Sequence, residues 1–302
     1  MTLRVTQSMM HSQLLRNVNN NLSRMERNQN VLSTGRKILK PSDDPVGITY
    51  ALHYRSELSI NEQYQKNIDT AKAYVDHTDT ILGQVNDLIQ RANELTTQGV
   101  NGTNPQSALD AIAQELGQIY EQAVTLGNDR LNGKYIFNGQ KTDIQPYTTA
   151  GAPTESSDDQ KIVYQFSAGV TVPINVTGNE VFGIGSGPNQ EPDNLFSVLK
   201  DLQNDFLNGD QTAARTDMDR LTSRFNKFLD VRAEVGARAN RIDLLDSRLQ
   251  DLNQNLTALD SKVEDADIAE TITNLQADQN VYQASLSVGA KIIQPSLLDY
   301  LR

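Results

Sequence analysis

The 302-residue sequence contains no cysteine and no tryptophan. The absence of cysteine excludes disulfide bonds, thiolate metal sites and a cysteine nucleophile. Only 6% of the residues are aromatic and 37% are hydrophobic, a composition that favours long helices with narrow cores over thick globular cores. No stretch approaches 18 consecutive apolar residues, and residues 1–30 lack the apolar segment of a signal peptide. The sequence therefore predicts neither a membrane span nor a cleaved signal.

Basic residues are also too few for a nucleic-acid binder. The formal net charge is −11, and binding to phosphates requires clustered Lys and Arg, so we expect no nucleic-acid partner and no membrane partner. The three histidines, His11, His53 and His77, lie far apart, and no motif of a metalloprotease, serine hydrolase or nucleotide-binding loop occurs. We predict that the protein is not an enzyme and has no cofactor and no metal site.

The first pattern that is present is a narrow apolar seam near the N-terminus. Its positions step by three and four and are Leu15, Val18, Leu22, Met25, Gln29 and Leu32. This spacing predicts an amphipathic helix that is too weak to stand alone. One alternative is an ordinary core helix of a globular domain.

A matching seam occupies the C-terminal tail. It consists of Ile268, Ile272, Leu275, Gln279, Tyr282, Leu286, Gly289 and Ile293, which is the heptad pattern of a helix that lies along another helix. Pro295 ends the pattern, and the last residues include the apolar side chains of Leu297, Leu298, Tyr300 and Leu301. We predict that the two terminal helices associate with each other and with other subunits, since the pair alone buries little apolar surface.

Long helices and turns fill the first half of the chain between these seams. Asp44 and Pro45 read as the N-cap and first position of a helix that runs to about residue 98. Asn104 and Pro105 are expected to cap the next helix in the same way, so that the two helices form an antiparallel hairpin. Two Asn-Gly turn signals bracket a β-forming run at 134–137, and a return strand is expected at 144–147.

Residues 148–193 differ in composition, because Gly, Pro, Ser and Thr dominate. Strands are predicted at 161–166 and 170–176, within an insertion that we expect to be exposed, separately folded and tolerant of change. Helices resume at residue 194 and continue to 263. Ser261 and Glu264 suggest a capping box where the tail begins. Acids at 264–267 could attract a cation, but acids near a helix N-terminus are the favoured interpretation.

These features predict a mainly α fold, an elongated, coiled-coil-like helical bundle with a short β-hairpin and a small β-rich inserted domain. The predicted divisions are an N-terminal assembly helix (1–43), a helical hairpin with the β-hairpin (44–147), the insertion (148–193), a return helix (194–263) and a C-terminal assembly helix (264–302). The helices of 1–43 and 264–302 are expected to form one inner domain.

Two terminal stretches have a distinctive sequence. The first comprises residues 22–38 and Pro41-Ser42-Asp43-Asp44-Pro45-Val46-Gly47, and the second comprises 261–269 and the Gln- and Ala-rich heptads that follow. Both stretches resemble those of bacterial flagellins. The run Lys40-Pro41-Ser42-Asp43-Asp44-Pro45 replaces the Ala-Ala-Asp-Asp run usual in filament flagellins. The ending at 295–301 is similar to that of the family members at the junction between flagellar hook and filament. The resemblance covers roughly 1–147 and 194–302.

The resemblance implies a structural protein of the bacterial flagellum that forms the junction between hook and filament. It further implies export through the flagellar type III apparatus, a chaperone on the C-terminal helix, self-association in a ring, and contacts with hook-associated protein 1 and flagellin. The hypothesis is that both terminal helices fold on assembly. The alternatives are filament flagellin and, less favoured, a coiled-coil signalling module.

The expected assembly interface draws on both termini. It comprises Leu15, Val18, Leu22, Met25, Leu32, Ile268, Ile272, Leu275, Tyr282, Leu286, Ile293, Leu297, Leu298, Tyr300 and Leu301.

Overall fold

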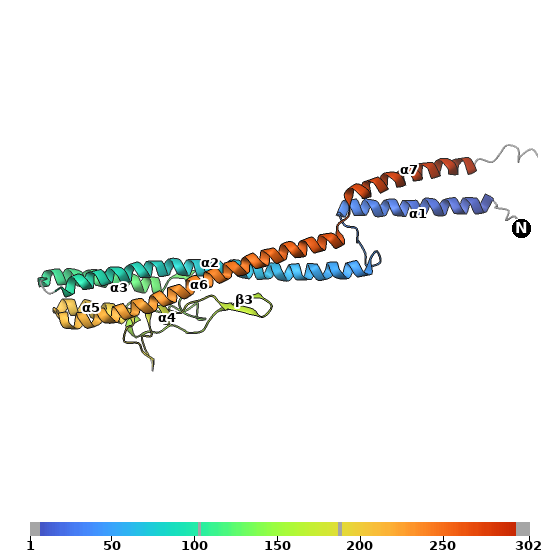
Figure 1. Cartoon of the computed structure of the whole chain (residues 1–302). Helices are drawn as coiled ribbons and strands as arrows, with labels where there is room; N and C mark the ends of the chain where they lie inside the picture. Colours follow the sequence, from blue (N-terminus) through green and yellow to red (C-terminus); the bar gives the residue numbers. More distant parts are fainter. Residues whose placement is uncertain (1–6, 102–103, 187–188, 294–302) are drawn as a thin grey trace, which may run out of the picture. The chain divides into compact units, whose positions relative to one another are not determined.

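The computed structural model describes residues 7–101, 104–186 and 189–293 (Figure 1). The chain divides into two compact units, one made of Met1–Ile60 with Leu252–Arg302 and the other of Asn61–Asp251. The fold is mainly α, as predicted. Its helices are α1 (Gln7–Thr34), α2 (Pro45–Val100), α3 (Gln106–Gly127), α4 (Gly178–Phe182), α5 (Leu195–Asn208), α6 (Gln211–Glu264) and α7 (Ile268–Ile293). The unit boundaries cut α2 and α6, and the predicted five-part division stays a prediction.

Of the three predicted helix caps, at Asp44, Asn104 and Ser261, only the one at Asp44 is present. The Asp44 carboxylate accepts hydrogen bonds from the backbone N–H groups of Val46 and Gly47, at 3.1 and 2.9 Å, and so caps α2. Asn194, for which no cap was predicted, also caps α5, by accepting from the N–H of Ser197. The prediction for Asn104 is wrong. Its amide donates to the carbonyl of Gln98 at 2.6 Å, and α3 begins at Gln106 with Pro105 at the N-cap position and no side-chain cap.

The first β-hairpin is shorter than predicted. Strands β1 (Arg130–Leu131) and β2 (Lys134–Tyr135) pair antiparallel around Asn132 and Gly133, which both have positive φ. The expected return strand at 144–147 is absent from the described structure. Tyr147 instead exchanges two hydrogen bonds with the side chain of Asn128, which satisfies its backbone without a strand partner.

The second hairpin lies within residues 148–193, near the predicted strands. Strand β3 (Val163–Ser167) pairs antiparallel with β4 (Val170–Pro173), with an irregularity between Gln165 and Ser167. A short 3-10 helix, η1 (Ala152–Thr154), precedes the hairpin and α4 follows it.

The side chains of this segment belong to the main core of the second unit. Phe166, Ile174 and Phe182 are buried in one hydrophobic cluster with residues of α2, α3, α5 and α6. The rings of Phe182 and Phe196 stack with centroids 4.9 Å apart, and Tyr147 meets Phe196 at 4.8 Å. The prediction that the insertion folds separately is therefore wrong, because its apolar residues complete a core that the helices share. Its tolerance of change stays a prediction.

A buried arginine fixes the chain where it re-enters the helices. The Arg224 side chain is 1% exposed, pairs with the Asp193 carboxylate at 2.7 Å, and also contacts Glu191. Its Nε donates to the carbonyl of Asp193 at 2.9 Å, and Lys227 pairs with both acids. These charge-assisted hydrogen bonds attach the end of the insertion to α6.

A crowded carboxyl group near the α5–α6 turn predicts a pH effect. Burial, together with the negative charges of Asp217 and Asp210, raises the pKa of Asp205 to about 6. Its Oδ2 atom is buried without a hydrogen-bond partner. Between its unfolded pKa of 3.8 and about 6 the folded protein binds the proton more tightly, so stability falls as pH rises through this window.

Replacement of Asp205 by Asn removes the free-energy cost of ionising a carboxyl group at this buried position. We expect Asp205→Asn to raise the free energy of unfolding by about 1–2 kcal/mol at pH 7–8, after allowance for partial exposure, with the gain shrinking toward pH 4. Thermal unfolding followed by circular dichroism across pH 4–8 measures it. Asp230→Asn, at an exposed position of α6, makes the same charge change as a control. An equal gain from both variants would show that only net charge matters.

Candidate assembly surface

Helices α1 and α7 lie side by side and antiparallel in the first unit (Figure 1). Each turns a strict four-three series of residues toward the other. On α1 the series is Leu14, Val18, Asn21, Met25, Asn28 and Leu32, and on α7 it is Thr271, Leu275, Asp278, Tyr282, Ser285 and Gly289. Gly289 is buried against Leu14, where a Cβ would come within 2.8 Å of Leu14 Cδ2. The pairing of the two termini is therefore the one the seams predicted, with knobs-into-holes spacing.

The seam itself is rotated by one residue from the predicted one. Val18, Met25, Leu32, Leu275 and Tyr282 face inward as expected and are half-buried. The prediction that six further residues lie on this seam is wrong, because each follows an inward-facing residue and is exposed. Two are polar, Gln29 and Gln279. The four exposed apolar ones are Leu15 at 51%, Leu22 at 41%, Ile272 at 43% and Leu286 at 49%.

The rotation has a physical cause in three polar residues. Asn21, Asn28 and Asp278 hold inward positions because the two asparagine amides donate across the pair to Asp278, Asn21 to its backbone carbonyl and Asn28 to its carboxylate. Asn21 is only 1% exposed. A search for apolar periodicity cannot find them, since it selects the apolar neighbours one position along. The two asparagines seven residues apart, on a helix without other breaks, are the sequence signal that was missed.

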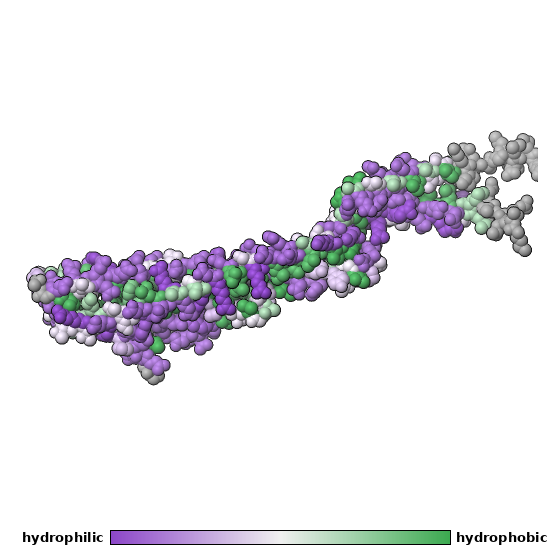
Figure 2. Space-filling model, in the orientation of Figure 1, coloured by the Kyte–Doolittle hydropathy of each residue, from purple (hydrophilic) through white to green (hydrophobic). Residues whose placement is uncertain are grey.

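The four exposed residues share one face of the pair. In an antiparallel pair of right-handed helices, residues that directly follow inward-facing positions lie on the same side of both helices. We call Leu15, Leu22, Ile272 and Leu286 the apolar flank. Figure 2 shows hydrophobic residues along α7 and mainly hydrophilic ones along the visible side of α1.

The remaining predicted interface residues lie at the ends of α7 and beyond it. Ile268, in the first turn of α7, is 44% exposed. Ile293 is the last residue of α7. Leu297, Leu298, Tyr300 and Leu301 lie outside the residues that the structure describes. The role of all fifteen residues in assembly stays a prediction.

The connectors next to the pair are joined by backbone and ionic bonds. Lys37 N–H donates to the carbonyl of Glu264 at 2.8 Å, and Ala266 N–H to that of Gly35 at 2.9 Å. The buried Glu264 carboxylate pairs with Arg36 at 3.3 Å and with Arg55 of α2. These bonds hold the start of α2, the end of α6 and both connectors together.

The predicted capping box at this joint is wrong. Helix α6 continues through Ser261 to Glu264, and the Ser261 hydroxyl donates to Asp265 instead. Asp267 caps the N-terminus of α7, because its carboxylate accepts from the N–H of Glu270 at 3.0 Å. Across the described parts of the chain, no group of three acidic, His or Cys side chains is arranged to hold a metal ion.

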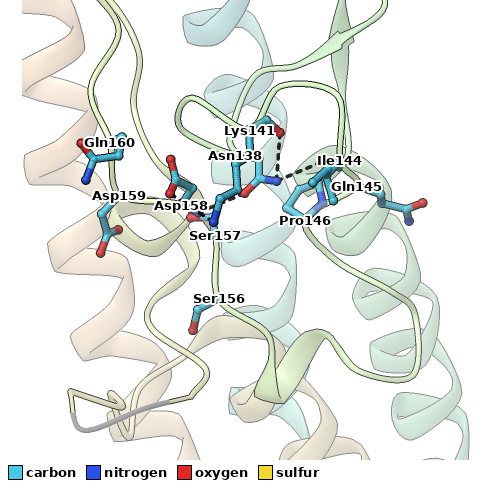
Figure 3. A pocket seen from close by; sticks show the side chains of 10 residues that line it. All are labelled: Asn138, Lys141, Ile144, Gln145, Pro146, Ser156, Ser157, Asp158, Asp159 and Gln160. Carbon is cyan, nitrogen blue, oxygen red and sulfur yellow. Dashed lines mark hydrogen bonds and ion pairs between the residues drawn. The ribbon is translucent and has the colours of Figure 1, made fainter.

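A polar pocket of about 580 Å³ lies in the second unit (Figure 3). Asn138 forms one wall, and its amide donates to the carbonyls of Lys141 and Ile144 while its oxygen accepts from the N–H of Asp158. Lys141 lies 3.5 Å from the Asp158 carboxylate. The hydrogen bonds of Asn138 join the segment at 138–146 to the segment at 156–160. The polar side chains of the pocket therefore have a structural role, which is to hold these two segments together.

Comparison with known proteins matches both ends of the chain. A model of the bacterial flagellin N-terminal helical region matches residues 5–142, and a model of the C-terminal helical region matches 218–301. Together they take in most of the chain, including both partners of the α1–α7 pair. The chain belongs to the bacterial flagellin family.

Relatives within the family extend over nearly the whole length. Flagellar hook-associated protein 3 of Escherichia coli K12 is 29% identical over 94% of this chain and 95% of its own. Flagellin of Bacillus subtilis 168 is 24% identical over 99% of this chain and 100% of its own. A putative flagellar hook-associated protein from Vibrio parahaemolyticus has the same fold, with a TM-score of 0.65 and 22% identity, covering 74% of this chain and 100% of that chain.

The family places the protein among structural components of the bacterial flagellum. Among the helices that the structure describes, none is both long and apolar enough to cross a membrane.

Proposed function

We propose that this flagellin-family protein is a hook-associated subunit that forms the junction between the flagellar hook and filament. The similarity to hook-associated protein 3 carries the proposal, because it runs through both terminal regions as well as the segment between them. Filament flagellin remains the second candidate, since flagellins match over a similar length at lower identity.

The α1–α7 pair supplies the contact surface in this proposal. Its apolar flank exposes four large aliphatic side chains to solvent. Because all four lie on the same side of the helix pair, this side is suited to packing against another helix. The occupant that we propose is a second copy of this chain, in a ring. The polar outer face of α1, with Arg16, Glu26 and Arg27, would stay accessible to water.

The finer partners follow from the family resemblance. We infer contacts with hook-associated protein 1 below and flagellin above, a chaperone on α7 before export, and delivery through the flagellar type III apparatus. The folding of α1 and α7 on assembly stays a prediction. Hydrogen exchange of the free subunit over residues 7–34 and 268–293 measures whether these helices are already folded. Strong protection of these residues from exchange would contradict the prediction.

Immunogold electron microscopy of isolated flagella tests the proposed location. We expect label at the hook–filament junction alone. Label along the filament would instead identify a filament flagellin.

A charge placed on the apolar flank tests the surface. Leu22→Glu is expected to leave the free subunit folded, because the side chain is exposed, but to reduce motility and junction incorporation at least tenfold by burying a carboxylate. Ser23→Glu adds the same charge on the exposed face of α1 and is the matched control. Wild-type motility of Leu22→Glu, with normal expression, would show that the apolar flank is not an assembly surface.

A further inference from the structure

Asp278 is the only charged residue of α7 between Thr271 and Ala290, and it faces α1. Its backbone carbonyl accepts from the Asn21 amide at 2.8 Å. Its carboxylate accepts from Arg24 Nε at 3.1 Å and from the Asn28 amide at 3.0 Å. Arg24 also donates to the Asn21 amide oxygen at 2.8 Å. We call these four residues the polar node.

The rest of the interface does not fix how far α7 is slid along α1. The other inward-facing residues of α7 repeat at the same four-three spacing, and they are small or apolar except for Tyr282. A slip of seven residues would therefore keep the seam intact while placing Thr271 or Ser285 opposite Arg24. The Arg24 guanidinium would lose its carboxylate, and the Asp278 carboxylate would be left largely buried without that partner, which is costly.

The same argument applies to the choice of partner helix. Two α7 helices from different copies, paired antiparallel around Asp278, would bring two carboxylates together, and α7 has no basic residue in this stretch to offset them. Helix α1 instead places the Arg24 guanidinium and the amides of Asn21 and Asn28 opposite Asp278, where all three donate hydrogen bonds to it. Polar residues inside helix pairs are known to select register and partner in this way.

We infer that Asp278 is a specificity-determining residue, which selects α1 as the partner of α7 and sets the register of the pair. The register matters for the apolar flank, because it brings Leu15 and Leu286 to the same end of the pair. After a seven-residue slip, Leu15 would lie beside Gln279 or beside Ile293 at the end of α7. The inference concerns pairing inside one subunit, so it holds whichever flagellar location the protein has.

The absence of cysteine makes the register directly measurable in the full-length chain. Leu14→Cys with Gly289→Cys reports the observed register, since these positions are in contact. Leu14→Cys with Tyr282→Cys reports a slip of seven residues. Mild oxidation is applied both to dilute subunit and to isolated flagella, so that the pair is sampled whether it forms before or during assembly. We expect an intramolecular disulfide in the first pair and little in the second.

Asp278→Ala is expected to lower the ratio of observed-register to slipped disulfide about tenfold or more, from the loss of charge-assisted hydrogen bonds. Asp278→Arg alone is expected to abolish the observed-register disulfide, and the charge exchange Arg24→Asp with Asp278→Arg to restore it in part. If the charge exchange restores the observed-register disulfide, the charge match between positions 24 and 278 selects the register. A residue that only stabilised the fold would not be rescued in this way. An unchanged ratio in Asp278→Ala, or loss of both disulfides without rescue, would overturn the inference.

Discussion

Replacing Phe182 by alanine is expected to lower the free energy of unfolding of the second unit by about 3–5 kcal/mol. The Phe182 ring is fully buried, stacks on Phe196 at 4.9 Å, and meets Phe137 and Tyr147 edge-on at 5.5 and 5.7 Å. Removing it leaves a cavity and breaks three aromatic contacts, each of which adds stability beyond buried area. Denaturant unfolding followed by circular dichroism gives the free energy directly.

Val163→Ala is the matched control, because Val163 lies in the same segment of the chain but is 59% exposed. We expect its effect to stay below about 0.5 kcal/mol. Equally small effects from both substitutions would mean that residues 148–193 fold apart from the helices. A large effect from Phe182→Ala also implies that deletion of the insertion, which composition alone suggested was harmless, would unfold the unit.

Replacing Arg224 by methionine is expected to cost about 3–5 kcal/mol, as for other buried ion pairs that lose one partner. Methionine keeps most of the volume of the side chain but leaves the Asp193 carboxylate, which is 5% exposed, with Lys227 as its remaining cation. Adding Asp193→Asn to Arg224→Met is expected to recover a large part of the loss, since the uncompensated charge is then gone.

The exposed Arg91 provides the control for this substitution. It pairs with Glu94 and Glu115 at the surface, so Arg91→Met should change the free energy of unfolding by no more than about 1 kcal/mol. Equal losses from Arg224→Met and Arg91→Met would contradict the assignment of a structural role to the buried arginine.

The contribution of the Arg224–Asp193 ion pair to stability also depends on pH. Burial works to raise the pKa of Asp193, but hydrogen bonds from Lys227 and Ser223 and the charge of Arg224 outweigh it and hold the pKa below the usual 3.8. The stability from this carboxylate is therefore fully present above pH 3.8 and is lost as pH falls through the folded value. The difference between wild type and Arg224→Met should shrink below that pH.

Local pattern was enough to predict the long helices and the pairing of the termini. The cap at Asp44 and the Asn132–Gly133 turn depend on a few neighbouring residues, so local sequence was enough to predict them. The heptad spacing at both ends likewise predicted two helices that need a partner, and the family resemblance followed from the same residues.

The rotation of the α1–α7 seam and the place of the insertion were decided only in three dimensions. Asn21 and Asn28 face inward because Asp278 lies opposite them, 250 or more residues away in the chain, and no local pattern records that match. Phe166 and Phe182 are buried because α2, α3, α5 and α6 leave room for them. The sequence determined which helices form and which of them need a partner, because helix formation and apolar spacing depend on near neighbours. Tertiary structure decided which face of the α1–α7 pair stays exposed, because that depends on polar contacts between distant residues.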